Sequence, residues 1–447
     1  MTFADLPPEV VQADPDVVAG FAHDEARLVR HGAPVAVLSP RTTDEVVACL
    51  RAADRAGLAV VTRGAGTGLA GGANAPDGAV VLSTRRLDKI VSLDVEERVA
   101  VVQPGVVTAD LRAAAADVGL FYPPDPGSVA TSTIGGNVAT NAGGMCCVKY
   151  GVTGDYVLGL EAVLADGRVL RTGRRTVKGV AGYDLTSLLV GSEGTLGVIT
   201  EVTVRLRPAP PPPATVVATF ASLADAGRAV ARITADGTDV SLLELLDSTT
   251  LSAIDANTGM GIAAEAMLLV QCDLPDPGPA MAAVGSACEA AGAVDVAVTT
   301  DPDEGAQLLE ARRQALPALE RLGDWLLDDV CVPRRSIVAL VEGIQRVAAD
   351  VGLTIGVFGH AGDGNMHPTI VFDRHDDASL AAAHRAFDAI TALALDLGGT
   401  ITGEHGVGRL KAGWLARELD PAALDVHRTV KAALDPHGRL NPSSVLA

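Results

Sequence analysis

The sequence GTGLAGGANAPDG at residues 66–78 contains the pattern G-x-G-x-x-G directly after an apolar segment, 58–62, which is typical of a short buried strand. In a nicotinamide-dinucleotide βαβ unit a long helix must begin at this loop, so that its N-terminus faces the pyrophosphate. Pro76 and the neighbouring glycines break a helix instead, and the next apolar segment, 79–83, predicts another strand. We therefore expect backbone N–H groups of this loop to meet phosphate outside such a unit. A purely structural turn would explain the loop if it stood alone.

Two further loops of small residues accompany it. Residues 122–144 read YPPDPGSVATSTIGGNVATNAGG, and residues 191–200 read GSEGTLGVIT before a predicted strand at 201–207. Small side chains let the backbone approach a ligand closely, while Ser, Thr and Asn add uncharged donors. Three such loops within about 200 residues favour a long, phosphate-bearing ligand with a flat ring system.

The composition excludes several classes of protein. The 447 residues carry 35 basic and 55 acidic side chains, a net charge of −20, which argues against a nucleic-acid or anionic-lipid partner. No apolar run approaches the ~18–20 residues of a membrane span, and the N-terminus resembles no signal peptide, so we expect a cytoplasmic protein. The six cysteines form no CxxC, so we expect them reduced; flavin attachment or a redox role for Cys146 or Cys147 is the alternative.

The run PAPPPP at 208–213 predicts a stiff connector between two halves. After it, strands and helices alternate, which predicts a ferredoxin-like α+β sheet; an ordinary α/β layer with another strand order is the alternative. The expected strands are 215–220, 241–247, 266–273 and 294–299, and the expected helices are 222–234 and 278–292. In the first half a helix is expected from 43 to 56.

A cluster of polar side chains follows in the second half. The segment VFGHAGDGNMHP places His360 and His367 in a glycine-rich turn after a predicted strand at 353–358, and GEHG places Glu404 beside His405. Two histidines and one carboxylate are a competent set of ligands for a divalent metal with open positions. From the residues alone, histidines satisfied by hydrogen bonds within loops remain the alternative.

At these loops the sequence resembles the FAD-binding domain of the vanillyl-alcohol-oxidase type of flavoproteins. More narrowly, it is similar to the bacterial glycolate oxidase flavin subunit and its D-lactate and D-2-hydroxyglutarate dehydrogenase relatives, over residues 34–445. The resemblance implies an α+β fold: an N-terminal segment 1–33, a two-part FAD-binding domain 34–210, a ferredoxin-like cap (substrate) domain 211–400, and a C-terminal segment 401–447 that returns to the flavin.

The resemblance also implies the residues that would bind FAD. No histidine stands in the first loop, so non-covalent FAD is expected. The implied cofactor-binding residues are Arg63, Gly64, Ala65, Gly66, Thr67, Gly68, Pro124, Asp125, Ser128, Thr131, Thr133, Gly135, Gly136, Asn137, Ala139, Asn141, Ala142, Glu193, Gly194, Gly197, Val198, Ile199 and Asn441.

In the same resemblance His360, His367 and Glu404 align with metal ligands, for which zinc is the first choice and manganese or iron stay open. His405 aligns with the catalytic base and Arg312 with an arginine that binds the substrate carboxylate. The alternative for Arg312 and its neighbour Arg313 is a solvated helix face. The expected reaction is metal-assisted hydride transfer from a small 2-hydroxy acid to flavin N5.

Three positions favour a monocarboxylate substrate, glycolate or D-lactate. Hydroxyglutarate-type relatives carry Lys, Asn and Thr where this chain has Leu327, Thr369 and Leu316. A D-2-hydroxyglutarate dehydrogenase, and a flavin subunit that transfers electrons only within a larger glycolate-oxidising complex, are the alternatives; a metal-dependent hydrolase would leave the three loops unused. A redox partner such as an iron–sulfur subunit is expected to accept the electrons, and an oligomer stays open.

Overall fold

The computed structural model describes residues 3–176 and 178–446. These residues form two compact units, each with its own sheet structure. The first unit contains residues 1–143, 152–209 and 404–447, and the second contains residues 144–151 and 210–403. Among the described residues, no helix is both long and apolar enough to cross a bilayer.

The first sheet of the first unit is small, with the strand order β1-β2-β4-β3, and its last three strands are parallel. Helix α2 (Thr43–Arg55) begins where the hydroxyl of Thr42 accepts a hydrogen bond from the N–H of Glu45, and its apolar face packs on this sheet. The glycine loop after β3 leads to β4 and not to a helix, as expected. The strands are β1 (Val11–Gln12), β2 (Ala36–Leu38), β3 (Val60–Arg63) and β4 (Val80–Ser83).

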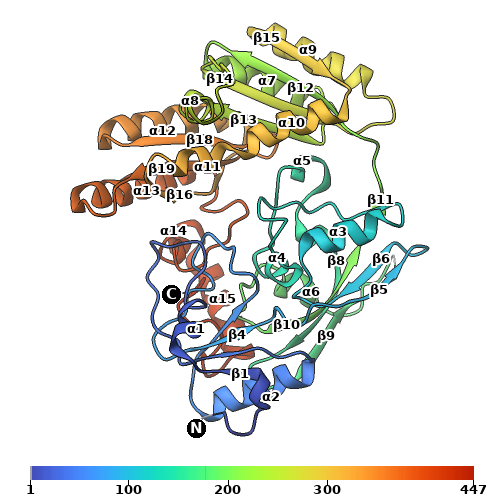
Figure 1. Cartoon of the computed structure of the whole chain (residues 1–447), viewed down its shortest axis with the longest axis vertical. Coiled ribbons are helices and arrows are strands. Elements are labelled where there is room, and N and C mark those ends of the chain that lie inside the picture. The colour runs from blue at the N-terminus through green and yellow to red at the C-terminus, as the bar shows by residue number, and fades with distance from the viewer. Residues whose placement is uncertain (1–2, 177, 447) are drawn as a thin grey trace. The chain divides into compact units, whose positions relative to one another are not determined.

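The second sheet of this unit is antiparallel, with the order β5-β6-β10-β8-β9 (Figure 1). Its strand β10 starts at Val198 and not at 201, so the predicted cofactor residues Val198 and Ile199 lie in a buried strand. The loop was predicted to extend to residue 200. It ends earlier because Val198 and Ile199 of the apolar run VIT already pair with β8. The strands are β5 (Ile90–Asp94), β6 (Val99–Val102), β8 (Val157–Val163), β9 (Val169–Gly173) and β10 (Val198–Arg205).

The remaining elements of the first unit are short, apart from the helices Thr108–Ala116 and Pro421–Leu434. The helices are α1 (Pro15–Ala19), α3 (Thr108–Ala116), α4 (Ile134–Thr140), α6 (Leu185–Leu189), α14 (Leu415–Glu418) and α15 (Pro421–Leu434), with 3-10 turns at Pro8–Val10, Thr153–Tyr156 and Ala412–Trp414. A two-stranded ladder joins β7 (Leu120–Phe121) and β11 (Arg207–Pro208).

The second unit is built on one large sheet with the order β15-β12-β14-β13-β18-β19-β16, to which β17 adds beside β19. Its first four strands are antiparallel to their neighbours and are joined as β12-α7-β13 and β14-α9-β15. This arrangement confirms the predicted ferredoxin-like fold. These elements are β12 (Ala214–Phe220), α7 (Leu223–Ala235), β13 (Leu242–Asp247), β14 (Ala266–Cys272), α9 (Gly278–Ala291) and β15 (Ala293–Thr299).

Four more strands extend the sheet past β13, and further helices complete the unit (Figure 1). The strands are β16 (Asp324–Leu327), β17 (Val330–Cys331), β18 (Thr354–His360) and β19 (Asn365–Phe372). The helices are α5 (Cys147–Tyr150), α8 (Ser248–Thr258), α10 (Pro302–Arg313), α11 (Ala315–Glu320), α12 (Ile337–Val351) and α13 (Asp377–Asp396), with a 3-10 turn at Arg334–Ser336.

The short segment 144–151 belongs to this second unit although its neighbours in sequence belong to the first. Side chains hold it there: the ammonium of Lys149 lies 2.8 Å from the Asp273 carboxylate, to which the Tyr150 hydroxyl also donates. Met145 packs against Leu242 and Leu269 of the sheet. The segment that follows the second glycine-rich loop is therefore held on the large sheet of the second unit.

Candidate functional site

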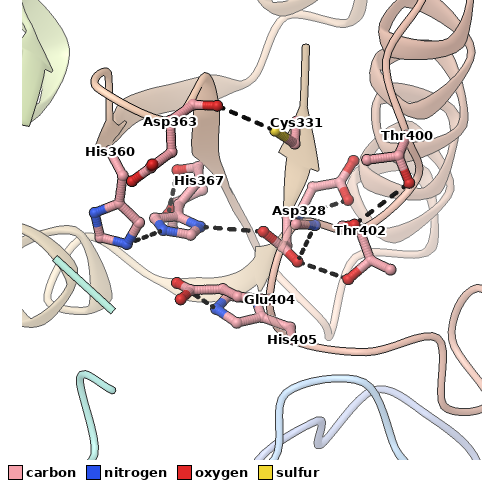
Figure 2. Close-up of polar contacts among 12 residues, drawn as sticks. Asp328, Cys331, His360, Asp363, His367, Thr400, Thr402, Glu404 and His405 are labelled. Atoms are coloured by element: carbon pink, nitrogen blue, oxygen red, sulfur yellow. Dashed lines mark hydrogen bonds and ion pairs between the residues drawn. The ribbon is translucent and has the colours of Figure 1, made fainter. Parts of the chain in front are cut away.

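The two histidines of the predicted metal motif lie on neighbouring strands. His360 ends β18 and His367 is the third residue of β19, so the turn contains only residues 361–364. The prediction that both histidines lie in the turn was wrong, because the strand continues two residues further. Phe358 is the direct partner of His367, which puts His360 and His367 on one face as diagonal neighbours. Their Nε2 atoms are 3.3 Å apart (Figure 2).

A glycine makes this tight hairpin possible. Gly364 has a φ of +83°, a region that side chains with a Cβ rarely adopt. A Cβ at this position would lie 2.1 Å from the carbonyl oxygen of Val332. The Val332 N–H in turn donates to the Gly364 carbonyl at 2.9 Å. The short connection and its close contact with Val332, the residue after β17, therefore require glycine.

A buried carboxylate on the next strand holds the first histidine. Glu244 of β13 is the direct cross-strand partner of His360 and is fully buried. Its Oε1 lies 2.6 Å from Nδ1 of His360. Because an ionised carboxylate only accepts, Nδ1 is the protonated nitrogen, and the lone pair of Nε2 points toward His367.

The same carboxylate also holds the predicted substrate arginine. Arg312 lies in the last turn of α10 and is only 6% exposed, so the alternative of a solvated helix face is wrong for Arg312. Its Nε and Nη2 donate to Oε2 of Glu244 at 2.7 and 2.5 Å. Burial by itself would raise the pKa of Glu244, but the charges and hydrogen bonds of Arg312 and His360 outweigh it and lower this pKa to about 2. Glu244 is therefore ionised at neutral pH.

The geometry of the histidine pair fits a metal ion. Two nitrogens at ~2.0–2.1 Å from a tetrahedral zinc are ~3.3–3.4 Å apart, and the measured Nε2–Nε2 distance is 3.3 Å. The oriented tautomer of His360 presents the nitrogen that a metal requires. The donor set fits zinc and equally suits other first-row divalent ions.

A second carboxylate lies on the other side of this pair. Oδ1 of Asp329 is 3.7 Å from Nδ1 of His367, too far for a hydrogen bond but close enough for an electrostatic interaction. Its Oδ2 accepts from the Thr402 hydroxyl at 2.7 Å and from the Gly403 N–H at 2.9 Å. Asp329, which faces His367, thus also holds Thr402 and Gly403, the two residues that precede Glu404.

Glu404 and His405 begin the last segment of the first unit. The His405 Nε2 is 3.8 Å from Oε1 of Glu404, and both side chains are largely buried (Figure 2). The two oxygens of Glu193 accept from the N–H groups of Val407 and Gly408 at 2.7 and 2.8 Å. Burial raises the pKa of Glu193 to about 7, although these two N–H groups oppose the shift. Glu193 therefore binds the backbone of the loop that carries His405.

The predicted FAD loops meet within the first unit. A Cβ on Gly64 would lie 2.5 Å from the hydroxyl oxygen of Thr133, so the first and second loops are in contact through a glycine. The Nδ2 of Asn441 donates to the carbonyls of Gly72 and Glu193, both at 2.7 Å, and joins the tail to the first and third loops. These contacts bring together parts of the chain that are up to 369 residues apart.

Buried polar atoms at the same place lack protein partners. Thr62 Oγ1, Arg63 Nε and Asn441 Oδ1 have no hydrogen-bond partner among the described residues. Because an unpaired buried polar atom costs free energy, such a cluster is typical of a surface that binds a polar ligand. The residues present therefore fit a dinucleotide such as FAD.

Other predicted cofactor residues make structural contacts. The side-chain amide of Asn137 donates to the Thr108 hydroxyl at 2.8 Å, and Oδ1 of Asn141 accepts from the Gly154 N–H at 2.8 Å. Thr131 is exposed, and its hydroxyl donates to the carbonyl of Ser128 at 3.3 Å. A Cβ on Gly135 would lie 2.3 Å from the Cβ of Pro104. These contacts explain part of the loop composition without a ligand.

Sequence reasoning missed Glu244 and Asp329. Glu244 is the single charged residue within SLLEL, in a strand that is buried throughout, and Asp329 stands in the apolar context LLDDV. An acid in such a strand must be paired, since an unpaired buried charge is very costly. This signal was present in the sequence, but the identity of the partners was not.

Comparison with known proteins matches two family models. The model described as "FAD binding domain" matches residues 34–173, and the model described as "FAD linked oxidases, C-terminal domain" matches residues 209–445.

Similar proteins span nearly the whole chain. Glycolate oxidase subunit GlcD of Bacillus subtilis is 43% identical, over 93% of this chain and 89% of its own length. D-lactate dehydrogenase of Anaerostipes hadrus is 33% identical, over 99% and 96%. The solved structure of p-cresol methylhydroxylase with bound substrate has a TM-score of 0.82 at 18% identity and covers 99% of this chain and 95% of that chain. This last similarity confirms the predicted fold of the vanillyl-alcohol-oxidase type.

Proposed function

The chain belongs to the FAD-linked oxidases, and from this premise we propose that it oxidises a small 2-hydroxy acid, glycolate or D-lactate, to the 2-oxo acid. One observation carries the proposal: His360 and His367 face each other at 3.3 Å beside the buried Arg312. This arrangement combines a divalent-metal pair with a cation for the substrate carboxylate.

The flavin would be held non-covalently in the first unit. The residues that would hold it lie in the loops around Arg63–Gly68, Ser128–Ala142 and Glu193–Ile199, together with Asn441 of the returning segment 401–447. When bound, FAD accepts the hydride that leaves the substrate Cα. The unpaired polar atoms of Thr62, Arg63 and Asn441 support this assignment.

The metal would be held by His360, His367 and Glu404. Glu404 directly follows Gly403, whose N–H is bound by Asp329 next to His367, and this supports the third ligand. When bound, the metal, zinc by preference, lowers the pKa of the substrate hydroxyl.

Two side chains would then act on the substrate. Arg312 binds the carboxylate of the 2-hydroxy acid through its guanidinium, whose planar fork matches two oxygens. His405 removes the proton of the hydroxyl group, since a neutral imidazole is a base near neutral pH. The proton therefore goes to His405 and the hydride leaves from Cα, which yields the 2-oxo acid.

Two uncharged side chains near His367 in the sheet favour a monocarboxylate. Leu327 and Thr369 are direct cross-strand partners, and Thr369 is two residues from His367 on the same face of β19. Both side chains are buried and neither carries a charge. A second substrate carboxylate against Leu327 would have no charged partner there, which costs several kcal/mol.

The test is an anaerobic panel of substrates followed by flavin absorbance. Glycolate or D-lactate is expected to bleach the flavin, L-lactate is the stereochemical control, and D-2-hydroxyglutarate is expected to react far more slowly. If D-2-hydroxyglutarate were the faster substrate, the monocarboxylate assignment would be wrong. If no 2-hydroxy acid reduced the flavin, the proposed activity would be refuted.

We also infer that a redox partner protein accepts the electrons. The Bacillus subtilis relative is named a subunit of glycolate oxidase, and within the sequence no CxxC cluster offers an iron–sulfur site. The purified chain is therefore expected to be reduced by substrate in a single turnover and to turn over only with an added acceptor. Rapid turnover with oxygen alone would contradict this inference.

A further inference from the structure

We propose that Glu244 is a positioning residue that holds the metal ligand His360 and the substrate-binding Arg312 in one arrangement. The inference deepens the proposed function and rests on it. Glu244 lies on β13, His360 on β18 and Arg312 on α10, so one carboxylate joins three elements.

Each oxygen of the Glu244 carboxylate accepts hydrogen bonds from a different side chain. Oε1 accepts from Nδ1 of His360 at 2.6 Å, while Oε2 accepts from Nε and Nη2 of Arg312. The sheet register fixes the first contact, because Glu244 and His360 are direct partners between β13 and β18. The last turn of α10 fixes the second. The metal ligand and the carboxylate-binding cation therefore cannot move independently.

The charge of Glu244 also fixes the tautomer of His360. A carboxylate can only accept, so the proton stays on Nδ1 and the Nε2 lone pair is available to a cation. A glutamine of the same shape behaves differently. Its single oxygen is drawn to Arg312, and its NH₂ group then faces Nδ1, which favours the tautomer with the proton on Nε2. That tautomer cannot bind a metal through Nε2.

Arg312 depends on the same group for its place. Arg312 is 6% exposed, and the central carbon of its guanidinium lies 4.8 Å from the centre of the Phe358 ring. Without the carboxylate the buried cation keeps this aromatic contact but loses both charge-assisted hydrogen bonds. Loss of Glu244 should therefore affect metal binding and substrate binding together, which a residue that only supports the fold would not do.

The experiment compares E244Q with a matched control, D247N, in the full chain. Asp247 is on the same strand and fully buried, and its Oδ1 accepts from the N–H groups of Thr250 and Val357, contacts that an asparagine oxygen keeps. Protein stripped with dipicolinate is titrated with Zn²⁺ against a chelating dye. The KM for D-lactate is then measured at saturating Zn²⁺.

For E244Q the Zn²⁺ dissociation constant is expected to rise by ~10–100-fold, the effect usual for a residue behind a metal-binding histidine. The KM for D-lactate is expected to rise as well, whereas D247N should match the wild type in both. A Zn²⁺ dissociation constant for E244Q within threefold of the wild type overturns the role of Glu244, whatever the activity. If the wild-type chain itself binds no divalent cation, the metal centre of the proposed function fails first.

A second variant covers the case in which E244Q gives no soluble protein. E244D keeps the charge but is one methylene shorter, so it cannot reach both partners at the observed distances. A weaker Zn²⁺ affinity or a higher KM is expected, according to which contact is lost. Wild-type values of both constants would overturn the proposal.

Discussion

At the scale of single residues, the chemistry of this chain depends on a few buried acids. Glu193 and Glu244 are both buried, yet their surroundings move their pKa values in opposite directions. Glu244 faces a guanidinium and an imidazole, which outweigh the cost of burial. Around Glu193, two backbone N–H groups and the Ser444 side chain lower the pKa, but burial and the charge of Asp24 outweigh them and leave this pKa at about 7. One acid is therefore a fixed charge and the other a group that titrates near physiological pH.

His405 offers the most direct test of the proposed proton transfer. H405A is expected to keep the flavin bound and to slow its reduction by D-lactate by ~10²–10⁴-fold, since the general base is lost. Anaerobic stopped-flow absorbance measures the rate. H427A removes an exposed histidine of α15 and should react like the wild type. Reduction of H405A at the wild-type rate would exclude His405 as the base.

Glu193 predicts a dependence of stability on pH. Its folded-state pKa of about 7 lies above the ordinary glutamate value of 4.5, so the folded state binds the proton more tightly. This contribution to stability is fully present below pH ~4.5 and is lost as the pH rises through ~7, with a slope of at most ~1.4 kcal/mol per pH unit.

Melting temperatures of the wild type at pH 5 and pH 8 are expected to differ more than those of E193Q. The exposed E97Q should keep the wild-type difference. An identical pH dependence in E193Q and the wild type would show that Glu193 does not titrate in this range.

At the scale of elements, the β18–β19 hairpin decides whether the histidines can act together. Side chains alternate across a strand, so a slip of one residue would turn one histidine to the other face. The four-residue turn sets the register that pairs Phe358 with His367. The same register continues to β13, where it places Glu244 opposite His360. Three neighbouring strands thus present their polar groups on one face.

Gly364 tests the importance of this turn. In G364A the added Cβ meets the Val332 carbonyl, so both the melting temperature and the Zn²⁺ affinity are expected to fall. G398A is the matched control, because Gly398 also has a positive φ of +79° but a Cβ there meets nothing within 4 Å. It should cost only the ~1 kcal/mol of backbone strain and leave Zn²⁺ affinity unchanged. Equal losses of Zn²⁺ affinity in both variants would contradict the role of the turn.

At the scale of the whole molecule, the flavin loops and the histidine pair belong to different units of the chain. The flavin loops and Asn441 belong to the first unit, whereas the histidine pair, Glu244 and Arg312 belong to the second. The third proposed metal ligand, Glu404, belongs to the first unit, but it is not one of the proposed flavin-binding residues. Because the flavin set and the metal set share no residue, each is expected to be loaded independently. The chain is continuous between them at Gly403 and Glu404, where one of the crossings between units occurs.

Metal removal should therefore separate the two regions. Dialysis against dipicolinate is expected to leave the flavin spectrum and its reduction by dithionite intact, while reduction by D-lactate is lost. Added Zn²⁺ should restore the reaction with D-lactate, and added Mg²⁺, which prefers oxygen ligands, should not. Release of the flavin together with the metal would contradict independent loading. Full activity in the metal-free protein would refute the metal-assisted step.

The sequence by itself determined the type of fold and the kinds of chemical group. Glycine loops, the helix-breaking Pro76 and the alternating segments after residue 213 are local signals, because they act through backbone conformation and side-chain period. They sufficed for the antiparallel sheet of the second unit and for the absence of a helix after the first glycine loop. The two histidines of the H-x6-H motif were also found in this way, as residue types with a spacing, whereas Arg312 was identified only by the resemblance to a known family.

Only the tertiary structure decided how these groups are paired. Glu244 and His360 are 116 residues apart, and Glu193 is more than 200 residues from the loop that it holds. Such contacts depend on the register between β13 and β18 and on the folding of distant loops against one another, which no local pattern specifies. For the same reason the sequence did not reveal that the side chains of Asn137 and Asn141, which stay predicted cofactor residues, make hydrogen bonds within the protein.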